Sequence, residues 1–466
     1  MAPLWLSRFR WLVALGGLAL LGLPVRADAP HIYAITGARI VTAAGAPIEN
    51  GTIVIRQGFI DAVGASVAVP PDATVIDGKG LTVYPGLIDM SRRGVVEPLV
   101  NPSPQNARAR EEIERWKRSV LMQPQHLAAR RVRVDAPELT RLAAAGITSV
   151  LAVPPGEVFK GQSALVNVVA PEDAPQIGSL ADERRGSIVL RTPVALHVAV
   201  PVRPAGNAYP QSLMGAIAFI RQAFLDAQHY QLEHARYARI KAGVERPTYD
   251  EALDALQASL ERRVPVAFEA SLDREIRRAL AIAREFQIAP IIIDGGLEAG
   301  EVAAELKQAG ARVVVSLNYP TRPRALAPDA DEPIRELRRR ANAPKVPSAL
   351  RAAGVPFAFG SAGLRDPKDF VKNAAAAVKA GLSPDGAIRA LTLDAATIAG
   401  VADRLGSIEK GKFANLIVTD GDLFADKMTI KHVFVDGRLV RIDPDRAPAT
   451  DDRRPTADAI ADDDPR

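Results

Sequence analysis

The sequence predicts an α/β protein with a (β/α)8 barrel and a small flanking β unit built from both chain ends. Short apolar runs alternate with helical runs over residues 85–397, and this repeat and length are typical of such a barrel. The apolar runs are continuous, which indicates parallel strands buried on both faces. Short β-rich runs with turn signals occupy both chain ends, which disfavours the alternative, a doubly wound open sheet.

The central region is predicted to contain strands and helices in alternation. Segments with apolar residues spaced three and four apart, such as 273–286 and 298–309, predict helices. A long helical segment, 210–262, is expected to be an insertion near the barrel mouth, and the Pro- and Arg-rich stretch 320–347 a loop over the same face. The predicted strands are 147–154, 187–200, 264–270, 289–296, 311–318 and 355–362.

The two chain ends share a second pattern. Near the start, runs such as IYAITGARIVTA and GTIVIRQGFIDAVG are separated by the turn dipeptides Asn50-Gly51 and Asp77-Gly78. The runs LGSIEKGKFANLIVTDGDLF and IKHVFVDGRLV near the other end have the same character. We expect residues 28–84 and 398–442 to form one composite β domain beside a barrel at 85–397.

The first 27 residues have the features of a secretory signal. Arg8 and Arg10 precede a nearly unbroken apolar run, 11–23, and small residues surround the boundary at Ala27. The run is shorter than the about 20 residues that a membrane-spanning helix needs. We expect cleavage after Ala27, a mature chain that begins at Asp28 without a stable membrane span, and a periplasmic or secreted location. An uncleaved signal that anchors the chain to the membrane is the alternative.

The charge pattern and the cysteine content exclude some classes of protein. The chain has a formal net charge of +5 and no cysteine, so it forms no disulfides and relies on core burial. The tail 443–466 is rich in aspartate and proline and is predicted to be disordered and mildly acidic. Because the sequence has no basic stripe with interleaved aromatic residues, nucleic-acid binding is not expected.

The segment 81–94, LTVYPGLIDMSRRG, contains the most informative motif. It resembles the end of the first barrel strand in the amidohydrolase superfamily of metal-dependent hydrolases, in an imidazolonepropionase-like form. In that superfamily a run V-x-P-G-x-I-D-x-H-x-H supplies two metal ligands, and alternate residues on a strand face the same way. The frame PGLID is kept here, but Ser91 and Arg93 stand at the two histidine positions.

A second motif, 391–418, resembles the C-terminal helix and strand that follow the last barrel strand in the same superfamily. The usual G-K-x-A-D-L is GKFANL here, so that Asn415 replaces an acid. The resemblance therefore extends over residues 30–442, and it implies a β-sandwich packed against the barrel.

The resemblance also places the other site positions. The fifth-strand histidine is replaced by Glu269, and the sixth-strand histidine by Asp294, or by Gly295 if the register is off by one residue. The catalytic aspartate of the last strand is replaced by Ala362. Each metal-site position that the resemblance identifies is therefore substituted.

The remaining histidines are not expected to form a metal site in place of the lost ligands. His197, within VALHVAV, lies on a predicted barrel strand, and a hydrogen-bonded core position is the favoured interpretation. His229 and His234 are five residues apart, a spacing that does not place two ligands on one helix face. The others are expected in solvent or in a polar loop or helix region: His31, His126 and His432.

Arg93 is expected to fill the vacated metal position and to form ion pairs with Glu269, Asp294 or both. A divalent ion at about 4 Å from a guanidinium meets roughly 8 kcal/mol of repulsion at an effective dielectric constant near 20. This repulsion disfavours a magnesium or calcium site built from Asp89, Glu269 and Asp294, although oxygen ligands suit those ions. The simpler alternative is that Arg93 points into solvent.

We therefore expect an exported amidohydrolase-superfamily protein that does not bind the catalytic metal. No cofactor is expected, although the family usually uses zinc or another divalent metal. Such a protein would bind a small molecule at the barrel mouth, or act as the partner of an active paralogue or as a homo-oligomer. The alternative is an active hydrolase of carbon–nitrogen bonds with a rearranged site.

Overall fold

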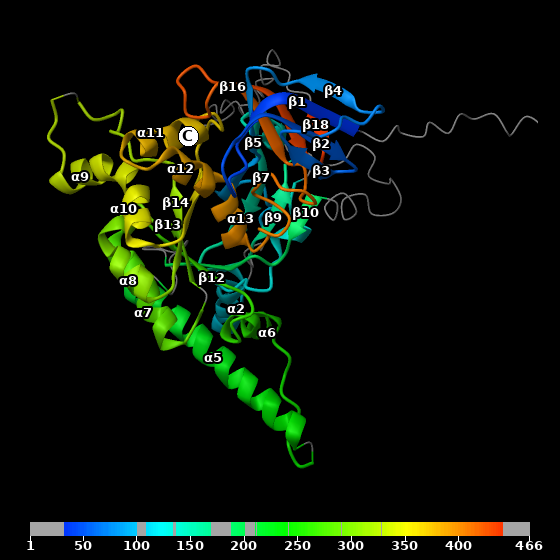
Figure 1. Ribbon diagram of the computed structural model, residues 1–466. Coiled ribbons are helices and arrows are strands. Elements are labelled where there is room, and N and C mark those ends of the chain that lie inside the picture. Colours follow the sequence, from blue (N-terminus) through cyan, green and yellow to red (C-terminus); the bar gives the residue numbers. More distant parts are fainter. Residues whose placement is uncertain are drawn as a thin grey trace, which may run out of the picture.

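The structure of the protein is a computed structural model. It describes residues 32–99, 109–133, 137–168, 188–200, 210, 212–240, 242–289, 291–327 and 329–440, so that the predicted signal segment, its cleavage site and the tail 443–466 lie outside the described residues. The described chain contains sheets of eight, six and four strands together with many helices (Figure 1). Among these residues no helix is both long and apolar enough to cross a membrane.

The eight-stranded sheet combines strands from both chain ends, as predicted. Strand β5 joins the two halves, because it is parallel to β1 on one side and antiparallel to β16 on the other. Apolar side chains from both halves share one core cluster, which includes Ile35, Ile53, Leu416 and Phe434. The strands are β1 (Ile32–Ile40), β2 (Ile48–Arg56), β3 (Phe59–Gly64), β4 (Thr74–Asp77), β5 (Leu81–Pro85), β16 (Leu416–Asp420), β17 (Thr429–Val435) and β18 (Arg438–Val440).

The predicted turns of this sheet are confirmed in one case and wrong in the other. Asp77-Gly78 does form the turn between β4 and β5, where the Asp77 carboxylate accepts a hydrogen bond from the Lys79 amide at 3.1 Å. Asn50-Gly51 instead lies inside β2, where Asn50 has a φ of 51° and the register with β1 shifts. An asparagine with positive φ accommodates the extra residue of a β-bulge, so the dipeptide bends the strand without ending it.

The six-stranded sheet contains five parallel strands, β11 to β15, and an antiparallel edge strand, β8. Predicted strands 264–270, 289–296, 311–318 and 355–362 agree with the structure within two residues at each end. The predicted strand 187–200 is wrong, because its two halves enter different sheets on either side of a cis Thr192-Pro193 bond. The strands are β8 (Phe159–Gln162), β11 (Leu196–Ala199), β12 (Val266–Ala270), β13 (Ile291–Gly295), β14 (Arg312–Ser316) and β15 (Phe357–Gly360).

The four-stranded sheet adjoins the six-stranded sheet at two places. Just beyond β15, the Ala362 amide donates to the Ser91 carbonyl of β6 at 3.0 Å, and only Ser163 separates β8 from β9. Side chains of both sheets belong to one apolar core cluster. The strands are β6 (Leu87–Arg92), β7 (Ile147–Ala152), β9 (Ala164–Asn167) and β10 (Val189–Arg191).

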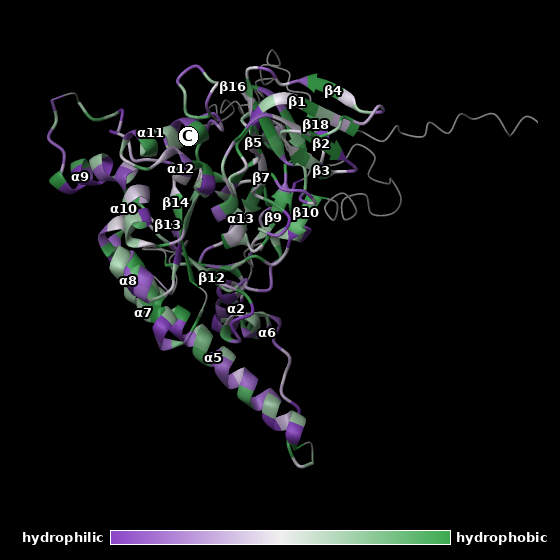
Figure 2. Ribbon diagram, in the orientation of Figure 1, coloured by the Kyte–Doolittle hydropathy of each residue, from purple (hydrophilic) through white to green (hydrophobic). Residues whose placement is uncertain are grey.

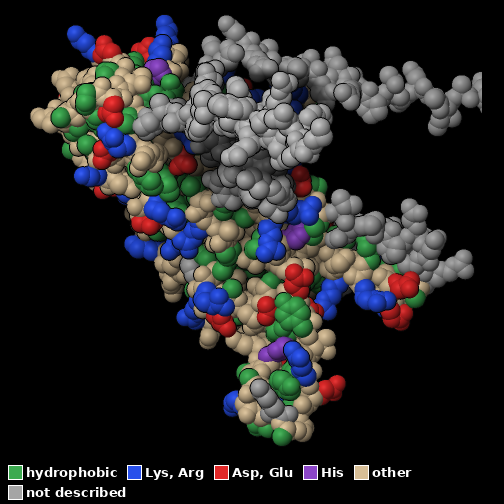
Figure 3. Space-filling view, turned by 90° about the vertical axis from the view of Figure 1, so that its right-hand side faces the viewer, with side chains coloured by type: hydrophobic (Ala, Val, Ile, Leu, Met, Phe, Trp, Pro, Cys, Tyr) green, Lys and Arg blue, Asp and Glu red, His purple; other side chains and the backbone are tan. Residues whose placement is uncertain are grey.

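The predicted insertion 210–262 is helical, with α5 (Leu213–Arg239) and α6 (Glu251–Leu260). Helix α5 begins where the Ser212 hydroxyl accepts a hydrogen bond from the Gly215 amide at 3.1 Å. It projects away from the sheets, and its projecting part alternates between polar and apolar turns (Figures 1 and 2). In the view of Figure 3, acidic and basic side chains are interspersed over the described surface.

The predicted loop 320–347 is wrong in its second half, which contains α9 (Ile334–Asn342) and η3 (Ala343–Lys345). Strong helix formers and an ion pair between Glu336 and Arg339, three residues apart in the sequence and 2.8 Å apart in space, stabilise α9 despite its many charges.

Predicted helix 273–286 is confirmed, and 298–309 is a short 3-10 helix followed by an α-helix. The remaining helices are α2 (Arg110–Leu121), η1 (Ala128–Arg130), α3 (Pro137–Ala144), α7 (Asp273–Glu285), η2 (Ala299–Val302), α8 (Ala303–Gln308), α10 (Val346–Ala353), α11 (Asp369–Lys379), α12 (Pro384–Leu391) and α13 (Leu393–Ala399).

Candidate functional site

Three potential metal ligands meet on neighbouring strands of the six-stranded sheet. His197 lies on β11, Glu269 on β12 and Asp294 on β13, and one ligand atom of each lies within 4.8 Å of the other two. Glu269 is the register partner of Asp294 on one side and of Ala199 on the other. Because alternate residues on a strand face the same way, His197 faces the same side as Ala199. The six-stranded sheet therefore presents all three side chains to one point.

The two candidates for the predicted sixth-strand position, Asp294 and Gly295, have different surroundings. Asp294 is the residue that faces the cluster, and its side chain is buried. Gly295 has a φ of 115°, and a Cβ atom there would lie 2.6 Å from the Ser271 hydroxyl. Of these two residues, Asp294 is therefore the one whose side chain belongs to the cluster.

Two cations hold the Glu269 carboxylate. The Lys160 ammonium lies 2.7 Å from Glu269 Oε1, and an Arg93 guanidinium nitrogen lies 3.3 Å from Glu269 Oε2. Lys160 comes from β8, next to β11, and its side chain is 11% exposed, whereas the Arg93 side chain is 47% exposed. Each oxygen of Glu269 is therefore paired with one positive charge, and the inner pair is the one with Lys160.

These charges shift the pKa values of the three clustered side chains in different directions. Burial raises the pKa of Glu269, but Lys160 and Arg93 outweigh burial and hold this pKa below its usual value. Burial, followed by repulsion from Glu269, raises the pKa of Asp294 to about 7. Burial lowers the pKa of His197 to about 4, against the opposing attraction of Glu269. At neutral pH the cluster thus contains a neutral imidazole, an ionised Glu269 and an Asp294 close to its own midpoint.

Ser91 and Asp89 tie β6 to this cluster. The Ser91 hydroxyl donates to Asp294 Oδ2 at 3.0 Å. Asp89 Oδ1 accepts from the amides of Ser91 at 3.1 Å and Ser361 at 2.7 Å. Burial raises the pKa of Asp89, while hydrogen bonds from Ser361 oppose this shift. Ser91 therefore occupies a histidine position of the motif as a hydrogen-bond donor, and Asp89 links β6 to the end of β15.

The predicted ion pair between Arg93 and Glu269 is present, but the predicted burial of Arg93 is wrong. Strand β6 ends at Arg92, so strand alternation no longer fixes the direction of the next side chain. The buried arginine is Arg92 instead, which forms an ion pair with Glu138 and donates to the Ser361 hydroxyl at 3.3 Å. Arg93 consequently covers the cluster from its solvent side.

Several polar atoms of the cluster have no partner among the described residues. Both ring nitrogens of His197 and Oδ1 of Asp294 are buried without a hydrogen bond. Buried polar groups are usually satisfied by protein or water, so these atoms favour an additional polar occupant. An imidazole nitrogen with two carboxylates is also a donor set that divalent ions use.

The charge around these donors opposes a divalent ion. Both oxygens of Glu269 are already paired with cations, and Asp294, whose pKa is raised by burial to about 7, carries only part of a negative charge at neutral pH. An ion at about 4 Å from the Lys160 ammonium would meet roughly 8 kcal/mol of repulsion at an effective dielectric constant near 20. This repulsion offsets the attraction of one ionised carboxylate at the same distance, so little attraction is left to compensate for the loss of the ion's hydration. The donor atoms therefore suit a metal, while the charge at the site does not.

The last-strand position and the other histidines lie outside this cluster. Ala362 has a φ of 44°, and its methyl group cannot accept a proton. His229 is exposed and pairs with Glu233, and the His234 ring lies 4.1 Å from the Tyr230 ring, tilted by 37°. Partial burial, followed by repulsion from Arg131, lowers the pKa of His126 to about 4. His432, expected in solvent, is partly buried on β17, and His31 lies outside the described residues.

His197 and Lys160 are two further site residues that sequence reasoning assigned wrongly or missed. His197 was expected to be hydrogen bonded in the core, but its buried ring faces the carboxylates without a hydrogen bond. Lys160 stands inside the apolar surroundings VFKGQSALV, and lysine is almost never fully buried unless paired. That context was the available signal for a buried ion pair.

Asn415, which replaces an acid of the second motif, forms a polar link between the two β units. Its side-chain amide donates to Asn167 Oδ1 at 2.8 Å and to the Ser149 hydroxyl at 3.2 Å. Its side-chain oxygen accepts from the Asp436 amide at 2.7 Å. This residue thus has a structural role at the contact between β16, β7 and β9.

The sequence pattern of the amidohydrolase family matches residues 192–440, more than half of the chain. The chain therefore belongs to the amidohydrolase family, and the predicted superfamily is confirmed. No curated protein sequence matches the chain.

Solved structures also resemble this fold. An amidohydrolase from Thermotoga maritima MSB8 has a TM-score of 0.70 at 23% identity, covering 88% of this chain and 99% of that one. A putative prolidase from Bifidobacterium longum has a TM-score of 0.52 at 18% identity, covering 88% and 94%. A molinate hydrolase has a TM-score of 0.51 at 19% identity, covering 88% and 95%. At these identities the likeness concerns the fold alone.

Proposed function

We propose that this protein is an amidohydrolase-family member in which Lys160 and Arg93 take the place of the divalent ion. It then binds a ligand or partner and does not hydrolyse a substrate. The observation that carries this proposal is the Glu269 carboxylate, which has one cation on each oxygen. Ala362 adds support, because the last-strand position has no carboxylate to accept a proton from water.

A second candidate function is hydrolysis of a carbon–nitrogen bond by a rearranged site. The unpartnered atoms of His197 and Asp294 favour it, because they leave donor atoms free for an ion or a water molecule. The pKa of Asp294, raised by burial to about 7, also suits proton transfer near neutral pH. Two structural neighbours are named as a putative prolidase and a molinate hydrolase, which is consistent with this class of reaction.

An activity assay separates the two candidates. The purified protein is incubated with a panel of dipeptides and N-acyl amino acids, as isolated and with added Zn²⁺ or Mn²⁺, beside an Asp294→Ala variant. We expect no turnover above that of the variant in any condition. Turnover that is lost in Asp294→Ala and abolished by a chelator would establish the second function and reject the first.

We also propose that the six- and four-stranded sheets form one closed (β/α)8 barrel at 85–397, flanked by a β-sandwich domain of 28–84 and 398–442. The contact between Ala362 and Ser91 supports closure on one side, and the single residue between β8 and β9 supports it on the other. The shared apolar core of the two end segments supports the sandwich.

Residues 1–27 have the charged, apolar and small-residue regions of a secretory signal. We propose that residues 1–27 are removed after Ala27 and that the mature protein is periplasmic or secreted, where it binds a small molecule at the barrel mouth, an active paralogue or a second copy of itself. The intact mass of protein produced in its own host checks the cleavage. A mass that includes residues 1–27 would indicate a membrane anchor instead.

A further inference from the structure

A cavity of about 410 Å³ lies between η2 and the helices α9 and α10. This volume is within the range of small-molecule sites. Its walls come from the segments that follow β13 and β14 and from the start of α7, and none of the clustered residues His197, Glu269 and Asp294 lines it. The cavity is therefore separate from the site described above.

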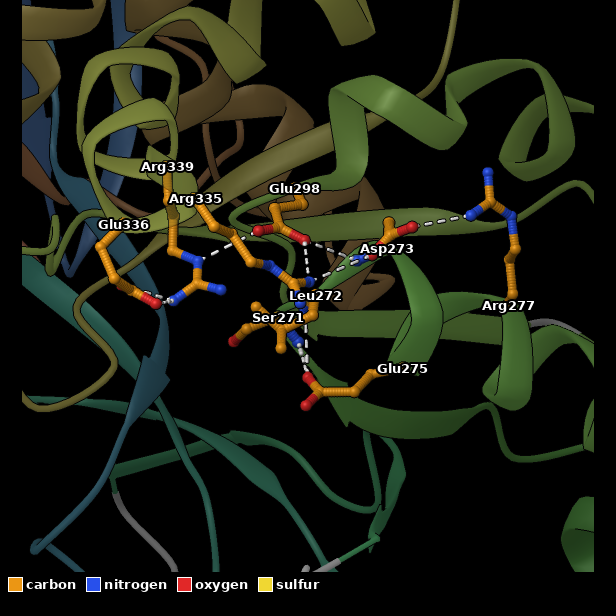
Figure 4. A network of polar contacts seen from close by, with 9 residues as sticks. All are labelled: Ser271, Leu272, Asp273, Glu275, Arg277, Glu298, Arg335, Glu336 and Arg339. Carbon is orange, nitrogen blue, oxygen red and sulfur yellow. Dashed lines mark hydrogen bonds and ion pairs between the residues drawn. The ribbon is translucent and has the colours of Figure 1, made fainter. Parts of the chain in front are cut away.

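Ion pairs fix one wall of this cavity (Figure 4). The buried Glu298 carboxylate accepts from Arg339 Nε at 3.0 Å and from the Asp273 amide at 3.0 Å. Arg335 lies 3.7 Å from both Glu298 and Asp273. The positive charges of Arg339 and Arg335 are thus compensated inside the protein, and these contacts hold α9 against the start of α7.

Two other cations that line the cavity are not compensated. The side chains of Arg338 and Lys345 are exposed, and neither has an ion-pair or hydrogen-bond partner among the described residues. The lining acids are Asp273, Glu298 and Glu301, and the first two are already paired with arginines. Among the lining residues, the acid Glu301 is thus the one negative charge that can offset the two unpaired cations, Arg338 and Lys345. The open part of the cavity therefore has an excess of positive charge.

An apolar surface stands beside these cations. Val346, which is buried, and Ala349 come from α10, and Leu297, from the segment before η2, lines the same cavity. Ile334, the first residue of α9, also lines the cavity. A ligand that fits both surfaces has a negative group at one end and a short apolar part at the other.

We propose that this cavity binds a small organic anion, with a carboxylate or phosphate contacting Arg338 and Lys345 and a short alkyl part against Val346 and Ala349. Charge-assisted hydrogen bonds from a guanidinium and an ammonium are the strongest polar contacts that the cavity offers. The proposal does not depend on whether the Glu269 cluster binds a metal.

Hexanoate is the probe that tests this site, titrated against the full mature protein with saturation-transfer NMR of the ligand. Inorganic phosphate tests the charge alone, and 1-hexanol tests the apolar part alone. We expect hexanoate to bind more tightly than either. Arg338→Gln and Lys345→Gln should each weaken hexanoate about tenfold, the loss expected for one charged hydrogen bond, while Glu301→Gln should strengthen it.

Lys410→Gln is the matched control, because Lys410 is an exposed lysine that does not line the cavity. Its hexanoate affinity should equal that of the parent. The substituted side chains are exposed, so circular dichroism should show folded variants. Absence of hexanoate binding, equal binding of hexanol, or undiminished binding in the Arg338→Gln/Lys345→Gln double variant would overturn the proposal.

Discussion

Replacing Lys160 with methionine is expected to lower the free energy of unfolding by about 3–5 kcal/mol, the usual cost of breaking a buried ion pair by removing one partner. The Lys160 and Glu269 side chains are 11% and 15% exposed, and their charged atoms lie 2.7 Å apart. Without the ammonium, the Glu269 carboxylate keeps only the exposed Arg93 as its partner. Urea unfolding followed by circular dichroism measures the change.

The matched control is Arg93→Gln, which removes a charge from the same carboxylate. Because the Arg93 side chain is 47% exposed, water screens its interaction, and the expected cost is below about 1 kcal/mol. A Lys160→Met/Glu269→Gln double variant should recover part of the loss, since it leaves no buried charge unpaired. Equal costs for Lys160→Met and Arg93→Gln, or no recovery in the double variant, would contradict the proposed inner pair.

Removing both cations is expected to turn the cluster into a divalent-ion site. In a Lys160→Met/Arg93→Gln variant the imidazole of His197 and the carboxylates of Glu269 and Asp294 remain, and the repulsion estimated above is gone. Added Zn²⁺ or Mn²⁺ should therefore stabilise this variant, by about 2.7 kcal/mol when the free ion is at 100 times its dissociation constant. The wild type should show no such shift. Urea unfolding with and without the ion measures both.

A third variant tests whether the added ion binds at the Glu269 cluster. Adding Glu269→Gln to the double variant removes one ligand charge and should abolish the stabilisation by the metal. Stabilisation that persists without Glu269 would show that the ion binds elsewhere. Stabilisation of the wild type by the same concentration of ion would show that Lys160 and Arg93 do not exclude it.

Much of the fold could be predicted from the sequence, because its strands are continuous apolar runs bounded by clear breaks. The exceptions have local causes. The run 187–200 is apolar throughout, but its halves enter different sheets at Thr192-Pro193. Asn50-Gly51 has the composition of a turn and serves as a bulge. Neither sheet assignment nor bulge position is encoded in the residue pattern alone.

The candidate site could be predicted only where the family motif marks a position. Ser91, Glu269 and Asp294 were identified from their places in the motifs, and the structure brings these three together. Lys160 lies 109 residues from Glu269 in the sequence, and no motif position refers to it. The pairing of β8 with β11 brings this lysine to the carboxylate. The role of Lys160 as a substitute cation can therefore be recognised only when the order of the strands in the sheet is known.

The metal content of the wild-type protein tests the central claim most directly. The mature protein is purified without chelator from cells grown with zinc, manganese and iron, and its bound metals are quantified by elemental analysis. If Lys160 and Arg93 take the place of the ion at Glu269, each chain should contain far less than one tightly bound divalent metal. Near-stoichiometric zinc, manganese or iron that is lost on Asp294→Ala substitution would contradict the account.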